Sequence, residues 1–178
     1  KLEAGKMEMS YKERDLHNTL MDCAAHFSQL SEEKKITLGT NNTTSNNLIV
    51  MDEPRIAQVI TNLLSNAIKF SHPETTVELT ISDSTIEQQT ADKETQTIPA
   101  ISLSVGDHGV GIPEDELESI FDKFIQSSKT KTGAGGTGLG LSISKEIIEA
   151  HHGTISAQSS PDEGTKITFT LPRNLSST

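Results

Sequence analysis

The sequence predicts an α+β fold in which helices cover one face of a mostly antiparallel sheet. Two segments, near residues 14–30 and 53–70, repeat apolar residues at the spacing of a helix. Around residues 77–81 and 101–105 every second residue is apolar, which is typical of strands with one buried face. The length of 178 residues suits one domain with a substantial core.

Composition limits the classes of function. Fifteen Lys and Arg residues against 25 Asp and Glu residues give a formal net charge of -10. This charge argues against nonspecific binding of nucleic acid and against direct contact with an anionic membrane. Any anionic ligand therefore needs local positive groups.

The cellular setting is constrained by what the chain contains. Its single cysteine, Cys23, falls in a predicted helix, so we expect a buried, inert thiol and a reducing compartment. No apolar run approaches the roughly 20 residues that span a bilayer, and no leader opens the chain. Because the chain starts at Lys1 without an initiator methionine, we expect a cytoplasmic piece of a longer protein. A membrane anchor elsewhere in that parent stays open.

The first third of the chain predicts one helix and two strands. An extended stretch near residues 7–11 precedes the helix over 14–30. Two short strands, at residues 34–40 and 46–52, flank the polar loop 41–47 and are typical of a hairpin.

The strands near residues 77–81 and 101–105 are separated by a polar segment. Residues 82–99 contain few apolar residues, and we expect a long, mobile hairpin loop there. Further on, residues 113–124 indicate a short helix with an acidic cap, and residues 127–138 form a flexible Gly, Ser, Thr and Lys stretch.

The last part of the chain predicts a helix and a strand pair. The helix runs from Leu139 to His151 and is closed by Gly153, in the usual position for a C-terminal glycine. Residues 153–160 and 164–172 then form two strands, before a polar tail.

The helix over residues 53–70 has two contrasting faces. Asp52 caps it, and Pro54 stands in its first turn, where a missing N–H costs little. At 100° per residue, one wide arc is apolar: Ile56, Val59, Ile60, Leu63, Leu64, Ala67 and Ile68. Opposite it lies a narrow polar stripe: Gln58, Asn62, Asn66 and Lys69. Carboxamide oxygens are neutral ligands for Mg²⁺, and an ammonium can meet a phosphate, but a plain solvated face explains the stripe equally.

Asp107 continues the buried parity of the strand near residues 101–105, so the pleat directs its carboxylate towards the buried side. A carboxylate there needs a hydrogen-bond donor, and an adenine amino group is suitable. Gly109 and Gly111 then let the backbone turn and a flat ligand approach. The alternative is that Asp107 merely begins a turn.

A glycine-rich segment opens the helix that follows residue 138. Free N–H groups and the positive end of the helix dipole would point at a ligand such as phosphate, with nearby lysines, Lys123, Lys129 and Lys131, adding charge. A glycine hinge without a ligand is the alternative. Residues 133–138 match the dinucleotide fingerprint in letters only, because no strand precedes them and no Lys-Ser/Thr pair follows as in a phosphate-binding loop. His151 and His152 are adjacent, which favours helix capping over a shared metal.

Four segments, in this order, resemble the N, G1, F and G2 boxes of the ATP-binding domain of sensor histidine kinases. They are QVITNLLSNAIKFS at 58–71, VGDHGVGIP at 105–113, IFDKF at 120–124 and GGTGLGLSISKEII at 135–148. These kinases share a superfamily with the gyrase, mismatch-repair and heat-shock chaperone ATPases. The resemblance covers roughly residues 11–172 and implies a two-layer α/β sandwich, with helices on one face of a mixed, mostly antiparallel sheet and a flexible ATP lid over residues 125–137.

The resemblance also implies roles for individual residues. Asn66, with Asn62 beside it, would bind Mg²⁺, Lys69 would lie near the phosphates, and Asp107 would read the adenine. The implied catalytic residues are Asn62, Lys69 and Lys123. The implied nucleotide-binding residues are Asn66, Phe70, Asp107, Gly109, Gly111, Ile112, Phe121, Phe124, Gly136, Thr137, Gly138, Leu139 and Gly140.

Asn62 stands where the ATP-hydrolysing relatives carry a glutamate that serves as general base. An amide cannot accept a proton from an attacking group, so the resemblance implies a site that holds Mg·ATP for a nucleophile brought from outside. In histidine kinases this nucleophile is a histidine on a dimerisation helix, and no histidine of this chain stands in the expected H-box setting. Two departures from the family pattern are Lys123, where arginine is frequent, and His108, where Asn or Thr is frequent.

The expected function is therefore phosphotransfer from ATP to a histidine on a separate dimerisation domain, within a pathway that includes a response regulator or receiver domain. Residues 1–10 would be the end of the dimerisation helix and linker, 11–173 the catalytic ATP-binding domain and 174–178 a tail. One alternative is a pseudokinase that binds nucleotide without phosphotransfer. A gyrase-like clamp is disfavoured by Asn62.

Overall fold

The computed structural model describes residues 8–117, 119–122, 140–160 and 163–174. Its seven strands are β1 (Lys12–Asp15), β2 (Thr37–Asn42), β3 (Leu48–Met51), β4 (Thr76–Gln89), β5 (Thr95–Gly106), β6 (Thr154–Ser160) and β7 (Gly164–Pro172). Its helices are α1 (Leu16–His26), α2 (Ser28–Glu33), α3 (Glu53–Phe70) and α4 (Gly140–Ala150), with 3₁₀ turns at Glu114–Glu116 and Ser119–Phe121.

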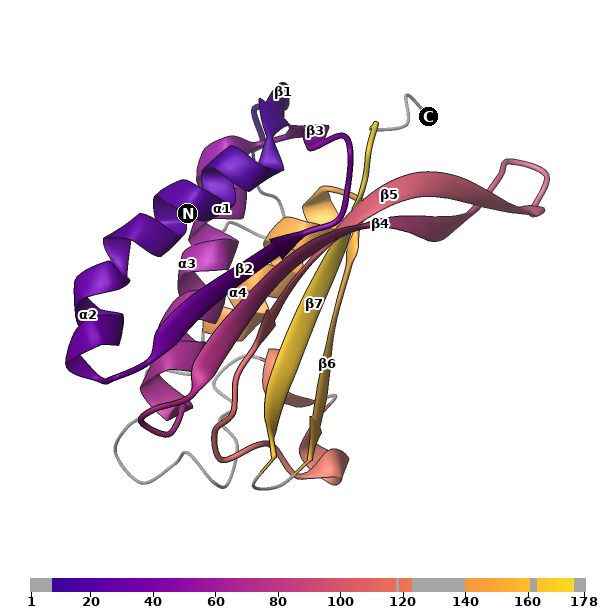
Figure 1. The fold of residues 1–178 in the computed structure, drawn as a ribbon. Coiled ribbons are helices and arrows are strands. Elements are labelled where there is room, and N and C mark those ends of the chain that lie inside the picture. Colours follow the sequence, from indigo (N-terminus) through magenta and orange to yellow (C-terminus); the bar gives the residue numbers. More distant parts are fainter. Residues whose placement is uncertain (1–7, 118, 123–139, 161–162, 175–178) are drawn as a thin grey trace.

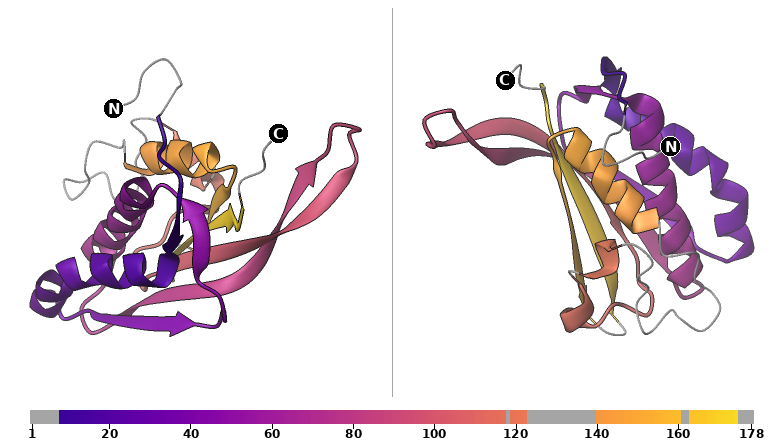
Figure 2. Two further views of the ribbon diagram at one scale, coloured as in Figure 1. Left: turned by 90° about the horizontal axis from the view of Figure 1, so that it is seen from above. Right: turned by 180° about the vertical axis from the view of Figure 1, so that it is seen from behind.

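Strands β2, β4, β5, β7 and β6 form a five-stranded sheet in that order, with only the β2–β4 pair parallel. Helices α1, α3 and α4 lie on the same side of this sheet (Figures 1 and 2). The prediction of helices covering one face of a mixed, mostly antiparallel sheet is therefore confirmed. Among the described residues, no helix is both long and apolar enough to cross a membrane.

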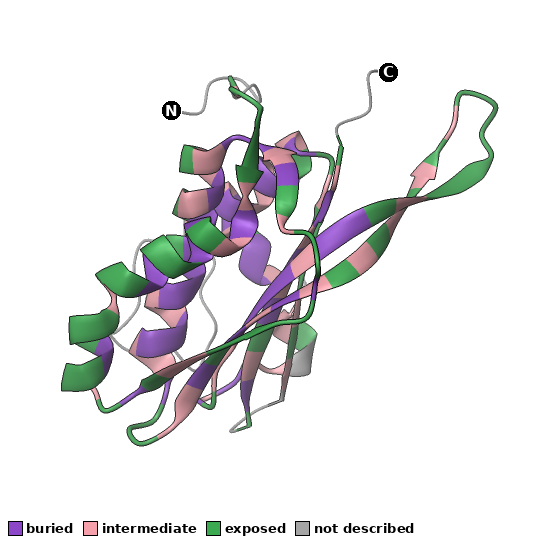
Figure 3. Cartoon of the chain, turned by 45° about the horizontal axis from the view of Figure 1, so that its top comes forward, coloured by how far each residue is buried: buried purple, intermediate pink, exposed green. Residues whose placement is uncertain are grey.

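The core lies between α3 and the sheet. The seven residues of the predicted apolar arc are the buried residues of α3. Opposite them, alternate residues of the central strands are fully buried, among them Leu79, Leu103 and Phe169 (Figure 3). Burying each such side chain contributes about 1.5–3 kcal/mol, so this interface fixes where the polar stripe points.

The start of α3 is built as predicted. Asp52 Oδ1 accepts a hydrogen bond from the Arg55 backbone N at 3.2 Å, and Pro54 lies in the first turn. Cys23 is also buried as expected, and burial raises the pKa of its thiol.

The first predicted helix is shorter than expected and broken. Residues 12–15 form β1 instead, because they pair antiparallel with β3. Helix α1 then ends before Phe27, whose backbone leaves the helical region, and a second helix, α2, follows. Ser28 Oγ donates to the Ala25 carbonyl at 3.0 Å, a local bond that competes with a continuous helix.

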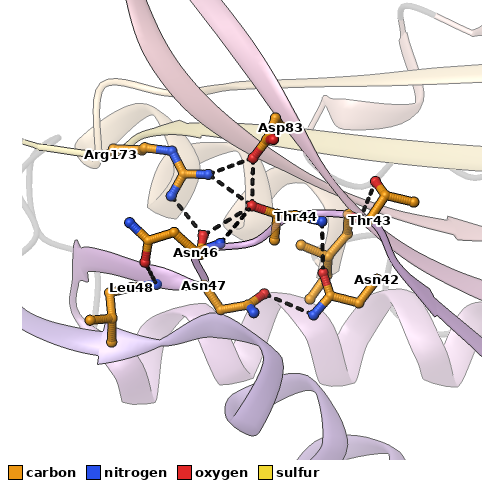
Figure 4. A network of polar contacts seen from close by, with 9 residues as sticks. Asn42, Thr43, Thr44, Asn46, Asn47, Leu48, Asp83 and Arg173 are labelled. Carbon is orange, nitrogen blue, oxygen red and sulfur yellow. Dashed lines mark hydrogen bonds and ion pairs between the residues drawn. The ribbon is translucent and has the colours of Figure 1, made fainter.

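The predicted hairpin of residues 34–52 is wrong. Strand β2 pairs parallel with β4, whereas β3 pairs with β1 in a separate two-stranded sheet. The polar loop between them is held by tertiary contacts rather than by a tight turn: Thr44 Oγ1 donates to Asp83 Oδ1 at 2.5 Å, and Arg173 binds Asp83 at 2.7 Å and the Asn46 carbonyl at 2.8 Å (Figure 4). Partners distant in sequence thus decide the pairing.

Most of residues 82–99 form strands, and only residues 90–94 connect them. Strands β4 and β5 stay paired from Glu78–Gly106 to Gln89–Thr95, and this ribbon extends beyond the body of the domain (Figures 1 and 3). The prediction is wrong because low apolar content does not exclude strands. β-Branched residues such as Ile86 and Ile98, which face each other, favour strand pairing without deep burial.

The remaining elements match with small differences. Two 3₁₀ turns replace the short helix predicted over residues 113–124. Helix α4 and the antiparallel β6–β7 pair are confirmed. At the end of α4 the left-handed residue is His152, with φ 62°, and not Gly153. Gly153 donates to the Ile148 carbonyl at 3.0 Å, and a Cβ there would lie 2.2 Å from the Thr170 carbonyl oxygen, so close approach to β7 is what requires a glycine.

Candidate functional site

The polar stripe of α3 faces the start of α4. Gln58 is exposed, while Asn62, Asn66 and Lys69 are half-buried. Asn62 Nδ2 donates to Ser144 Oγ of α4 at 3.4 Å. Within the described part of the chain, the Asn66 side chain has no hydrogen-bond partner, so its carboxamide is available to a ligand.

Gly140, the first residue of α4, lies against Asn62. A Cβ on Gly140 would come within 2.2 Å of Asn62 Oδ1 and 2.8 Å of its Cγ, so any larger residue would have to displace the Asn62 side chain. The start of α4 therefore lies beside the Asn62 carboxamide of α3, and the N-terminal end of a helix is where backbone N–H groups can meet an anion. The asparagine-containing motif at 58–71 and the glycine-rich motif at 135–148 are therefore in contact through Asn62 and Gly140.

Asp107 follows the end of β5 and is fixed by backbone donors. Its Oδ1 accepts hydrogen bonds from the Gly109 N at 3.0 Å and the Thr165 N at 3.1 Å. Among the described residues no bond ends on Oδ2. Burial raises the pKa of Asp107, although the two backbone bonds and the nearby His108 and His72 act in the opposite direction. The carboxylate thus offers one acceptor oxygen in a partly desolvated position.

The loop after Asp107 lies against the last turn of α3. A Cβ on Gly109 would lie 2.0 Å from the Phe70 carbonyl oxygen, and Gly109 forms an isolated β-bridge with Ser71. Gly111 has φ 73°, a left-handed conformation that favours glycine. Gly111 therefore allows the predicted turn, whereas Gly109 allows the loop to approach the backbone of α3; the predicted approach of a ligand to these glycines stays a prediction.

Lys69 and Phe70 lie at the same end of α3. Lys69 Nζ stands 5.6 Å from the centroid of the Phe70 ring, a cation–π distance. From Asn62 to Phe70 the helix rises about 12 Å, a distance that an extended nucleotide can bridge with its base at one end and its terminal phosphate at the other.

The structure thus brings the predicted residues into two clusters on α3. Asn62, Asn66 and Gly140 form the first, and Phe70, Asp107 and Gly109 form the second, with Gly111 and Ile112 following in the loop. Phe121 is buried in a 3₁₀ turn that contacts α4. Six predicted residues lie outside the described part of the chain: Lys123, Phe124, Gly136, Thr137, Gly138 and Leu139.

Sequence reasoning missed several residues that support the site. Ser144 binds Asn62, Thr165 binds Asp107, and Ser159 binds the Ile112 N. Gly164, with φ 101°, packs so closely that a Cβ would lie 2.1 Å from the Asp107 carbonyl oxygen. The glycine that opens β7 was the one available signal, and the hydroxyl contacts depend on tertiary packing.

His151 and His152 have structural roles. His151 is buried, its Nε2 accepts from the Asp52 backbone N at 3.0 Å, and its Nδ1 donates to the Ile147 carbonyl at 2.8 Å. Among the described residues, no three His, Cys, Asp or Glu side chains gather in a way that could hold a metal ion. The preference for helix capping over metal binding fits His152, which terminates α4.

The chain is similar to known proteins in sequence and in fold. Residues 51–175 match the model of the histidine kinase-, DNA gyrase B-, and HSP90-like ATPase family. The chain is 40% identical over 125 residues to sensor histidine kinase WalK of Bacillus subtilis (strain 168), a match that covers 70% of this chain and 19% of that protein. A sensor protein kinase WalK of Staphylococcus haemolyticus is 39% identical over 123 residues, 68% of this chain and 18% of that protein. The chain thus spans about a fifth of the length of these relatives.

Solved structures show the same fold. The catalytic domain of histidine kinase ThkA superposes with a TM-score of 0.73 at 28% identity, covering 93% of this chain and 97% of that one. Full-length ShkA in complex with AMPPNP gives a TM-score of 0.74 at 25% identity, covering 97% of this chain and 33% of ShkA.

Proposed function

Since the chain belongs to the histidine kinase-, DNA gyrase B-, and HSP90-like ATPase family, we propose that it is the ATP-binding catalytic domain of a sensor histidine kinase. It transfers the γ-phosphoryl group of ATP to a histidine on a separate dimerisation domain. The relatives at 39–40% identity are sensor kinases, which favours transfer over the pseudokinase alternative. The observation that carries the proposal is the meeting of Asn62 with Gly140 at one point of α3 and of Phe70 with Gly109 at its end.

The residues present fit ATP and Mg²⁺. Asn66 offers a half-buried carboxamide without a partner among the described residues, and Asn62 lies one turn away, so neutral oxygen ligands suited to Mg²⁺ stand beside the N–H groups of α4. At the C-terminal end of α3, Asp107 offers an acceptor for the adenine amino group. When bound, Mg²⁺ neutralises charge on the β- and γ-phosphates.

The chain's own contribution is binding, orientation and electrostatics. Lys69 and the N-terminal turn of α4 supply positive potential in a chain of net charge -10. Asn62 is a neutral amide whose nitrogen is engaged with Ser144, so it cannot accept a proton from water. The site therefore holds the nucleotide for an acceptor that arrives from outside, and imidazole needs no such base.

The wider assignment follows from this role. We propose that residues 11–173 are the catalytic domain, that residues 1–10 continue from the dimerisation helix, and that 174–178 are a tail. The partners are the histidine-bearing dimerisation domain of the same parent and a response regulator or receiver domain. The domain works in the cytoplasm, where ATP is available.

The test mixes this chain with the separately purified dimerisation domain and γ-labelled ATP. We expect phosphohistidine on the dimerisation domain and no label on the chain alone. Asp107→Asn should abolish transfer, whereas Asp92→Asn, at the exposed tip of the ribbon, should leave it unchanged. Tight nucleotide binding without transfer would support the pseudokinase instead, and steady ATP hydrolysis by the chain alone would support a clamp.

A further inference from the structure

The hydroxyl group of Ser159 lies where three segments of the site meet. Ser159 is in β6, and its Oγ is 2.6 Å from the backbone N of Ile112, 2.7 Å from the carbonyl oxygen of Gly164 and 3.0 Å from Thr165 Oγ1. Ile112 follows the loop that carries Gly109 and Gly111, here called the glycine loop. Gly164 and Thr165 are the first two residues of β7. One side chain therefore joins the glycine loop to the start of β7.

The directions of these bonds follow from their chemistry. The Ile112 N–H can only donate and the Gly164 carbonyl can only accept, so the single hydroxyl proton of Ser159 goes to Gly164. The Thr165 hydroxyl must then donate to Ser159 Oγ. All the hydrogen-bonding groups at this junction are satisfied together, which makes the junction specific for a hydroxyl at position 159.

The start of β7, which Ser159 binds, also fixes Asp107. The Thr165 N donates to Asp107 Oδ1 at 3.1 Å, and the Asp107 N donates to the Thr165 carbonyl at 2.8 Å. Gly164 packs on the backbone of Asp107 with no room for a Cβ. A shift of the start of β7 would therefore rotate or release the Asp107 carboxylate.

We propose that Ser159 is a positioning residue for base recognition: it holds the glycine loop against the start of β7, so that Asp107 keeps one carboxylate oxygen directed at the nucleotide base. This inference rests on the proposed function, because it takes Asp107 as the acceptor for the 6-amino group of adenine. It assigns purine selectivity to a residue that need not touch the nucleotide.

The selectivity between ATP and inosine 5′-triphosphate, which carries a 6-oxo group, separates this role from a structural one. A general loosening of the fold would lower the affinity of the chain for both nucleotides equally. Loss of the Asp107 orientation lowers the affinity for ATP specifically, since the 6-oxo group of inosine triphosphate donates no hydrogen bond to the carboxylate. The affinities of both nucleotides for the 178-residue chain are therefore measured by titration calorimetry with Mg²⁺.

In Ser159→Ala we expect the ratio of ATP affinity to inosine triphosphate affinity to fall about tenfold, the effect of one lost hydrogen bond in a site of this kind. Ser159→Thr, which keeps the hydroxyl on a strand that tolerates β-branched residues, should restore the ratio. If the alanine variant does not fold, Ser159→Cys, with a weakly bonding thiol of similar size, gives the same test.

Ser102→Ala is the matched control, because Ser102 also makes a short hydroxyl bond, 2.6 Å to Thr170 Oγ1, but in the middle of the sheet. It should change the melting temperature and not the ratio. A wild-type ratio in Ser159→Ala would overturn the inference and leave the proposed function standing. A wild-type chain that binds neither nucleotide would overturn both.

Discussion

The side chain of Asn62 lies directly against Gly140, at a distance that leaves no space for a Cβ. This contact joins the helix that carries the carboxamides to α4, whose start we propose faces the phosphates. Neither residue is unusual by itself, and the site depends on their contact.

Gly140→Ala should therefore damage binding more than folding. The added methyl group would displace the Asn62 carboxamide, and because that carboxamide is the end of a flexible side chain, it can move without unfolding the helix. We expect ATP affinity to fall at least tenfold with α4 retained, as measured by calorimetry and circular dichroism. Gly106→Ala is the control, since a Cβ there would meet nothing closer than 3.9 Å; equal losses in the two variants would refute the role of the Asn62–Gly140 contact.

Asn66→Asp should abolish Mg-dependent ATP binding and leave the fold intact. The change replaces an amide, half-buried and without a partner among the described residues, by an anion beside the triphosphate. Gln58→Glu adds the same charge to the exposed part of the stripe and should bind ATP normally. Unchanged affinity in Asn66→Asp would remove Asn66 from the site.

Nucleotide binding should depend on the ionisation of Asp107. Burial raises the pKa of this carboxyl, and its protonated form would present a donor where the adenine amino group also donates. ATP affinity should consequently fall as the pH decreases through that raised pKa. Asp107→Asn should bind ATP weakly at every pH, and a pH profile that survives this substitution would assign the titration to another group.

His151 should make folding stability depend on pH. Burial lowers its pKa, despite the opposing effects of its bond to the Ile147 carbonyl and of Asp52, while His152 adds to the lowering. The folded state then prefers the neutral ring, so stability is complete above the unfolded pKa of about 6.5 and is lost as the pH falls from there through the folded pKa. The Tyr11 ring, edge-on to His151 at 5.3 Å, and Asp52 complete its surroundings.

Thermal melts of His151→Phe at several pH values check this. The variant should lose about 1–3 kcal/mol at pH 7.5, because the Asp52 N–H loses its acceptor, and the difference from wild type should shrink towards pH 5.5. His26→Phe alters an exposed histidine and should leave the pH dependence of wild type in place. A constant difference across the pH range would contradict the role of His151.

The features that sequence could predict are those set by local patterns. The apolar arc of α3, the Asp52 cap and the alternation of Leu79 and Leu103 follow from the geometry of one helix or strand. The four motifs then identified the clusters around Asn62 and Asp107, and the structure brings each cluster together.

The features that sequence missed depend on distant partners. Strand β2 pairs with β4 because the intervening chain crosses over as α3, and the loop that was read as a hairpin turn is bound to Asp83 and Arg173. The ribbon of β4 and β5 is stabilised by backbone pairing, which leaves little apolar signal. Likewise, the Ser159 junction joins Ile112 to Gly164, 52 positions apart, and no local pattern encodes it.

The base should lie at the C-terminal end of α3 and the triphosphate along the polar stripe towards the middle of that helix. A crystal structure of this chain with Mg²⁺ and a non-hydrolysable ATP analogue tests this arrangement most directly. We expect the base beside Asp107 and the glycine loop, and the metal and phosphates against Asn62, Asn66 and the start of α4. A triphosphate bound away from the asparagines, or a base that does not contact Asp107, would contradict the account.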